Sequence, residues 1–199
     1  MMNLKKYAVT RLVVALCVIV YVMQLYTRGK IDFALFFIPE KILGDLELWR
    51  IITPAFLHFG VTHILFNVLI FFFFGSALEH HLRSFRLLGM VVVFAAFSNI
   101  IQYLISQSFA FGGLSGVVSG IIGYCVIMST VPGADEKFKI SVGLCFVNII
   151  FNVFEYFTDS HVAFGAHAAG LAAGLAWGII DWQRMNVGSG RRESLRVIP

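Results

Sequence analysis

The sequence predicts an all-α membrane protein, folded as a bundle of six transmembrane helices. Hydrophobic residues make up 59% of the 199 residues, charged residues only 13%, and the mean hydropathy is +0.85. Apolar residues usually account for about 45–50% of a soluble domain, so this composition indicates a membrane protein. The charges lie between long apolar stretches, which is typical of a chain that crosses a bilayer several times.

Six apolar stretches are long enough to be spans, because a transmembrane helix needs roughly 20 mostly apolar residues. They cover residues 8–27, 61–79, 87–105, 114–131, 139–157 and 163–181. The first resembles a signal peptide, but no small-residue cleavage site follows it, so we predict a retained helix. The chain then forms one transmembrane domain at 1–187 and a basic tail at 188–199, whose Gly, Ser and Arg content predicts disorder.

The segment between the first two spans, residues 28–60, carries too many charges to cross a bilayer. It also contains large apolar residues such as Phe36, Phe37 and Trp49, which are not typical of a flexible loop. We therefore predict an amphipathic outer loop between helices 1 and 2, compact and partly helical, lying in the membrane interface.

Basic residues set the orientation. Eleven of the fifteen Lys and Arg residues lie on the side that holds both termini, which places both termini in the cytoplasm. The amino-terminal ends of the fourth and sixth spans then both face the outer side. No single helix face collects the basic residues, so nucleic acid is not expected as a partner.

Two polar residues mark these outer ends. Ser115 stands in Gly-Leu-Ser-Gly at the start of the fourth span, and His167 stands in Ala-His-Ala-Ala-Gly at the start of the sixth. Polar side chains at membrane depth are expensive and usually functional. A serine beside a histidine base is an activated nucleophile, so the pair predicts a protease inside a membrane.

Small residues at four-residue spacing follow both polar residues. Gly116 and Gly120 follow the serine, and Gly170, Gly174 and Gly178 follow the histidine. Such stripes let two helices pack nearly backbone to backbone. We therefore expect Ser115 and His167 to come within hydrogen-bond reach.

His63 and Asn67 share one face of the second span, because they are about one helical turn apart. Both are suitable donors to the oxyanion that forms during acyl transfer. The alternative is that they only bond neighbouring helices.

Other mechanisms fit the sequence poorly, and no metal or cofactor is expected. His58 and His63 lack the spacing and the intervening carboxylate of a zinc-protease helix. An aspartyl protease needs two aspartates at membrane depth, and only Asp181 comes close. The three cysteines fit no metal spacing and are read as apolar fillers.

In their order along the chain, these residues resemble the rhomboid family of intramembrane serine proteases, in its bacterial form with a minimal core. The resemblance rests on Trp49-Arg50, His58, His63-x-x-x-Asn67, Glu79, Gly-Leu-Ser-Gly at 113–116 and Ala-His-x-x-Gly at 166–170. It implies a rhomboid six-helix bundle in which Ser115 and His167 form a dyad and His63 and Asn67 stabilise the oxyanion. The serine helix is expected to begin inside the bilayer, after a re-entrant loop at about 106–114.

The resemblance also implies transmembrane protein substrates, surrounding membrane lipids and a bacterial inner membrane, with the site open to the periplasm. One position departs from the family pattern: Ser119 stands where an aromatic residue often packs on the histidine ring. Two rival functions remain, a catalytically inactive rhomboid-like protein that binds membrane clients, and a transporter. A transporter would show repeated halves, which the sequence lacks.

Overall fold

The computed structural model describes residues 7–132, 138–139, 143, 145–147, 150 and 163–194, with side chains as far as Met185. Among the described residues, three helices are both long and apolar enough to cross a membrane: α1 (Ala8–Thr27), α4 (Val61–Leu82) and α5 (Ser84–Ser106). They match the first three predicted spans closely. The predicted fifth span, 139–157, lies almost wholly outside the described residues.

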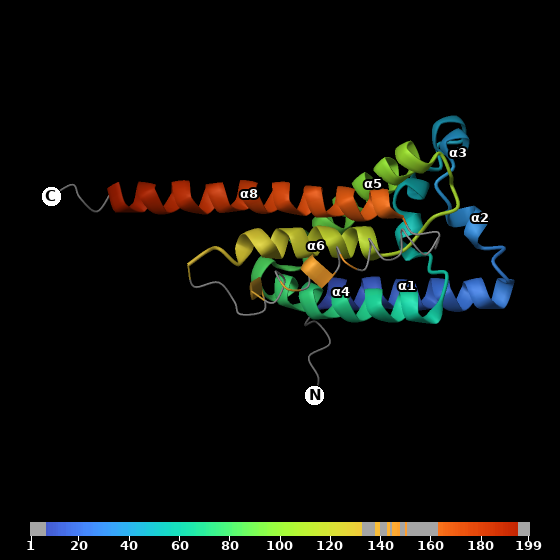
Figure 1. Ribbon diagram of the computed structural model, residues 1–199, viewed down its shortest axis with the longest axis horizontal. Helices are drawn as coiled ribbons and strands as arrows, with labels where there is room; N and C mark the ends of the chain where they lie inside the picture. Colours follow the sequence, from blue (N-terminus) through green and yellow to red (C-terminus); the bar gives the residue numbers. More distant parts are fainter. Residues whose placement is uncertain are drawn as a thin grey trace.

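Helix α6 (Ser115–Met128) occupies the centre of the bundle, between α8 on one side and α1 with α4 on the other (Figure 1). Ten consecutive residues, 116–125, are buried. A helix that is apolar on every side is stable only when neighbours surround it. Its 14 residues rise only about 21 Å, less than the roughly 30 Å of a hydrocarbon core. The helix is also shorter than the predicted fourth span, 114–131.

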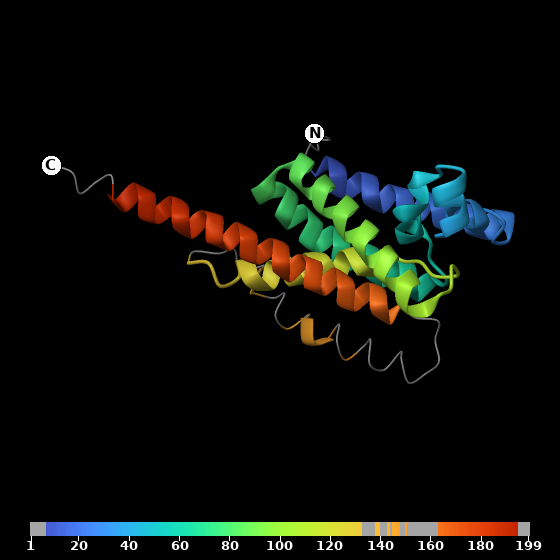
Figure 2. The ribbon, with the colours of Figure 1, turned by 90° about the horizontal axis from the view of Figure 1, so that it is seen from above.

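Helix α8 (Phe164–Ser194) runs beside α6 in both views (Figures 1 and 2). It continues well past the predicted end of the sixth span at 181 and includes residues 188–194 of the predicted tail. Extending a helix that has already nucleated costs little per residue, even where glycines weaken it.

Four short helices form the segment between α1 and α4. They are α2 (Asp32–Leu35), α3 (Pro39–Gly44) and two 3₁₀ turns, η1 (Leu48–Ile51) and η2 (Thr53–Phe56). The buried Arg50 holds them together, because its guanidinium donates to the Phe33 and Phe36 carbonyls and pairs with Glu47 at 2.5 Å. The segment is therefore compact and partly helical, as predicted.

Glu79 joins three helices near the end of α4. Its carboxylate accepts the backbone N–H groups of Val9 and Thr10 and the hydroxyls of Thr10 and Ser84. These bonds satisfy the open amino-terminal end of α1 and tie it to the start of α5. Glu79 thus has a structural role, which explains a buried carboxylate far from Ser115.

Candidate functional site

Ser115 and His167 meet at the amino-terminal ends of α6 and α8. The ring nitrogen Nε2 of His167 lies 2.5 Å from Ser115 Oγ, and both residues are partly exposed. Serine opens α6, and His167 lies in the first turn of α8. A hydroxyl hydrogen-bonded to a neutral imidazole is the arrangement of a nucleophile and its general base.

The glycine stripes bring the two backbones together, as the sequence predicts. A Cβ added at Gly170 would overlap the carbonyl oxygen of Gly116, and one added at Gly174 would overlap that of Gly120. Further along, a Cβ at Gly123 would lie 2.6 Å from the Leu171 carbonyl oxygen. Only a glycine at these positions permits the close approach that places the serine beside the histidine.

The side chains of His63 and Ser115 both approach the position that a Cβ at Gly113 would occupy. A Cβ built at Gly113 would lie 2.6 Å from His63 Nε2 and 3.5 Å from Ser115 Oγ. The His63 Nδ1 atom accepts the Phe59 backbone N–H at 3.5 Å, so the proton of the neutral ring belongs on Nε2. His63 therefore presents an N–H donor toward the serine.

Asn67 lies one turn further along α4 and is buried. Its amide Nδ2 donates to the His63 carbonyl oxygen at 2.9 Å, which uses one of its two N–H donors. The structure thus brings His63 close to Ser115, and the Asn67 side chain donates to the backbone carbonyl of His63.

The loop before Ser115 is held by the segment that precedes α4. The Gly113 backbone N–H donates to the Pro54 carbonyl at 2.9 Å, and Gly113 has φ +128°, in the region that favours glycine. A Cβ at Gly112 would lie 2.7 Å from the Cβ of Leu57. Two adjacent glycines therefore let this loop lie directly on the 54–57 backbone.

His58 adds a side-chain link to the same loop. Its Nδ1 lies 3.1 Å from the Phe56 carbonyl, which can only accept, so Nδ1 carries the proton. Its Nε2 then accepts the Leu114 backbone N–H at 3.4 Å. Burial, together with the neighbouring His63 ring, lowers the pKa of His58 to about 4, so this link stays neutral at pH 7.

The sequence alone missed this support. His58 is fully buried, and its backbone N–H donates to Gln24 Oε1 of α1 at 3.0 Å. The available signal was Gln24, a polar side chain in the predicted first span. A polar side chain at that depth requires a partner.

The amino-terminal end of α8 is fixed to α5. Gln102 Oε1 accepts the Ala166 backbone N–H at 3.0 Å, directly before His167. Asn99 similarly donates to the Ile51 carbonyl at 2.9 Å. Two polar side chains of α5 thus bond to segments outside that helix, Gln102 to α8 and Asn99 to η1.

The second ring nitrogen of His167, Nδ1, is buried and receives no hydrogen bond from any described residue. Ser119 is fully buried one turn after Ser115. Within the described part of the chain, therefore, no carboxylate or hydroxyl bonds to Nδ1 of this histidine. The ring bonds Ser115 through Nε2, and Gln102 fixes the backbone directly before His167. In that same part of the chain, no three His, Cys, Asp or Glu side chains form a metal-binding group.

Comparison with known proteins agrees with this geometry. Residues 45–184 match the family model of the rhomboid domain. The chain is 37% identical over 172 residues to Rhomboid protease GlpG of Serratia proteamaculans, covering 85% of this chain and 61% of that protein. It is 33% identical over 181 residues to Rhomboid protease GlpG of Haemophilus influenzae, covering 87% of this chain and 90% of that protein. This chain thus spans about three fifths of the Serratia relative and most of the Haemophilus one.

Proposed function

Because the chain belongs to the rhomboid family, we propose that it is an intramembrane serine endopeptidase with Ser115 as nucleophile and His167 as base. The observation that carries this proposal is the 2.5 Å hydrogen bond between their side chains. The relatives named as rhomboid proteases support the same activity.

Ser115 Oγ attacks the scissile carbonyl carbon, while His167 Nε2 takes the hydroxyl proton. The tetrahedral intermediate collapses, and the imidazolium returns that proton to the leaving amine. Water then attacks the acyl-enzyme with His167 as base, and the imidazolium returns that proton to Ser115 Oγ as the ester bond breaks and the carboxylic acid leaves. The His63 Nε2–H, the second N–H of Asn67 and the Ser115 backbone N–H stabilise the oxyanion.

The substrates are transmembrane segments of other proteins, and the chain lies in a bacterial inner membrane with both termini in the cytoplasm. Three membrane-length helices support the membrane location. The excess of basic residues on the side of the termini supports the orientation.

Cleavage of a fluorescently labelled transmembrane substrate by the purified, detergent-solubilised chain tests this function. A fluorophosphonate probe, which labels activated serines, provides a second readout. An inactive client-binding protein would hold the substrate without cutting it and would stay unlabelled.

We expect His63→Ala and Asn67→Ala each to slow cleavage by about 10²–10³-fold without blocking it, because each removes one oxyanion donor. Melting temperature is measured beside the rate. Asn99→Ala is the matched comparison, because it removes a buried amide whose recorded bonds go to the backbone carbonyls of Ile51 and Ile52. That variant should have a lower melting temperature but a nearly unchanged cleavage rate. Unchanged rates in both variants would show that His63 and Asn67 do not stabilise the oxyanion.

Ser119→Ala should cleave at the wild-type rate. Ser119 is fully buried. Nδ1 of His167 receives no hydrogen bond from any described residue, Ser119 included. Its small size permits close packing, and alanine keeps that size. A several-fold loss of rate with Ser115 still labelled by the probe would instead assign its hydroxyl to orienting the base.

A further inference from the structure

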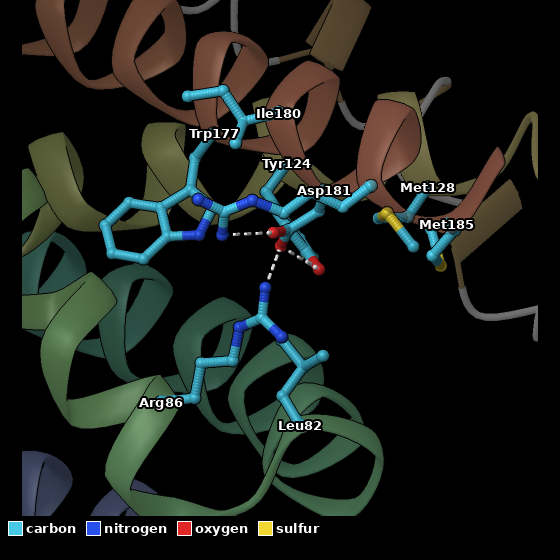
Figure 3. Close-up of a pocket in the computed structure, with 9 residues that line it drawn as sticks. Leu82, Arg86, Tyr124, Met128, Trp177, Ile180, Asp181 and Met185 are labelled. Atoms are coloured by element: carbon cyan, nitrogen blue, oxygen red, sulfur yellow. Dashed lines mark hydrogen bonds and ion pairs between the residues drawn. The ribbon is translucent and has the colours of Figure 1, made fainter. Parts of the chain in front are cut away.

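A pocket of about 570 Å³ lies at the opposite end of α6 from the Ser115–His167 pair (Figure 3). Ser115 is the first residue of α6, whereas Met128, its last, lines the pocket. The other walls come from the end of α4, the start of α5 and the middle of α8. Because the catalytic pair is at the other end of α6, the proposed protease mechanism does not use this pocket.

The pocket lies at the depth of lipid headgroups. Leu82 ends α4 and Arg86 lies in the first turn of α5, and both residues line the pocket. Each of these helices is long enough to cross a membrane, so the junction between them is at a membrane surface. Tyr124 and Trp177 add aromatic rings of the kind enriched at that depth.

Asp181 is the buried polar centre of the pocket, with its side chain only 5% exposed. Its Oδ2 accepts hydrogen bonds from Arg86 and from the Tyr124 hydroxyl, the latter at 3.1 Å. Its Oδ1 receives no hydrogen bond from any described residue. A buried carboxylate oxygen without a donor is costly, and this one lacks a donor inside a pocket.

Two arginines flank the Asp181 carboxylate, Arg86 at Oδ2 and Arg184 near Oδ1. Arg184 Nη1 is 4.0 Å from Asp181 Oδ1, too far for a hydrogen bond, and its side chain is 76% exposed. Arg86, whose side chain is 40% exposed, uses only one N–H group on Asp181. Both guanidinium groups therefore have donors left for a phosphate, the anion whose geometry suits them best.

The remaining lining is apolar and includes Met128, Ile180 and Met185 (Figure 3). An occupant must therefore combine a phosphate, a hydrogen-bond donor for Asp181 and an apolar body. Small soluble phosphates lack an apolar body. Their binding would leave the apolar side chains of the pocket exposed to water.

We propose that this pocket binds the headgroup of a phosphoethanolamine lipid. The phosphate accepts hydrogen bonds from Arg86 and Arg184, and the primary ammonium, an ethylene link away, donates to Asp181 Oδ1. As Arg184 swings to the phosphate, it uncovers Oδ1 for the ammonium. Basic pockets between transmembrane helices are known positions for lipid headgroups. A phosphocholine headgroup has no N–H to donate, and a phosphoglycerol headgroup has no positive charge for Asp181.

Native mass spectrometry of the delipidated full chain tests this assignment. Dioctanoyl phosphatidylethanolamine, phosphatidylcholine and phosphatidylglycerol are added separately at equal concentration. We expect the ethanolamine lipid to bind about tenfold more tightly than the choline lipid, since one hydrogen bond to a charged group accounts for that ratio. Equal retention of all three lipids, or preference for phosphatidylglycerol, would overturn the proposal.

Three variants sharpen the test. Arg184→Gln should weaken ethanolamine lipid binding about tenfold. Because the Arg184 side chain is exposed, this variant should fold normally. Arg83→Gln is the matched control, because Arg83 is an exposed arginine at the same end of the bundle and does not line the pocket. Asp181→Asn should remove the preference for ethanolamine over choline. Equal losses in the Arg83 and Arg184 variants would reduce the effect to net charge and contradict a built site.

A competition experiment distinguishes binding of the whole lipid from binding of its soluble headgroup. Free phosphoethanolamine, added at the concentration of the lipid, should fail to displace it, because it buries no surface on Met128 and Ile180. Displacement at equal concentration would overturn the assignment to a lipid.

Discussion

Replacing Ser115 with alanine should abolish cleavage of a transmembrane substrate, with a loss of at least about 10⁴-fold. His167→Ala should cause a loss of the same order. In the proposed mechanism nucleophile and base act as one unit, because His167 Nε2, 2.5 Å from Ser115 Oγ, is the proton acceptor for the attack. The double variant should therefore be no slower than either single variant. Initial rates with the purified chain in detergent measure all three.

The fold must survive these changes for the comparison to be meaningful. Ser115 is partly exposed, so its alanine variant should melt within a few degrees of wild type. The fluorophosphonate probe should label wild type and fail on Ser115→Ala. Cleavage at the wild-type rate by a well-folded Ser115→Ala protein would refute the serine mechanism itself. Loss of activity only with loss of folding would leave Ser115 with a structural role.

The meeting of Ser115 and His167 could be predicted because it depends on helix periodicity. Glycines spaced by four residues fall on one helix face, and two such faces can approach nearly backbone to backbone. The approach of Gly170 and Gly174 to the carbonyls of α6 follows from this spacing. Apolar length similarly predicts α1, α4 and α5, since a bilayer fixes how long a span must be.

The support around the pair could not be predicted in the same way. The bond from Leu114 to His58 and the bond from His58 to Gln24 join residues far apart in the chain. They depend on the particular path of the loop at 107–114 and on the turn of η2, for which no periodic pattern exists. The pocket around Asp181 is a further case. Its residues come from four helices, and their convergence depends on how those helices pack.

The close contact between α6 and α8 should fail if Gly174 is enlarged. Even the Cβ of alanine would overlap the Gly120 carbonyl oxygen, which is backbone and cannot rotate away. Overpacking a core typically costs about 1–3 kcal/mol. We expect Gly174→Ala to fall in that range and Gly174→Val to exceed it, with the melting temperature falling in the same order. Gly170→Val should behave alike, because its Cβ would overlap the Gly116 carbonyl.

Activity should fall together with stability in these variants, unlike in Ser115→Ala. Separating α6 from α8 lengthens the distance between Ser115 Oγ and His167 Nε2, and misplacement by about 1 Å can cost about 10²-fold in rate. Gly89 in α5 is the matched control, because a Cβ added there meets nothing within 4 Å. Gly89→Val should therefore keep both the rate and the melting temperature. If Gly174→Val cleaved at the wild-type rate with an unchanged melting temperature, α6 and α8 would not be in backbone contact, and the glycine stripe would not be what brings Ser115 to His167.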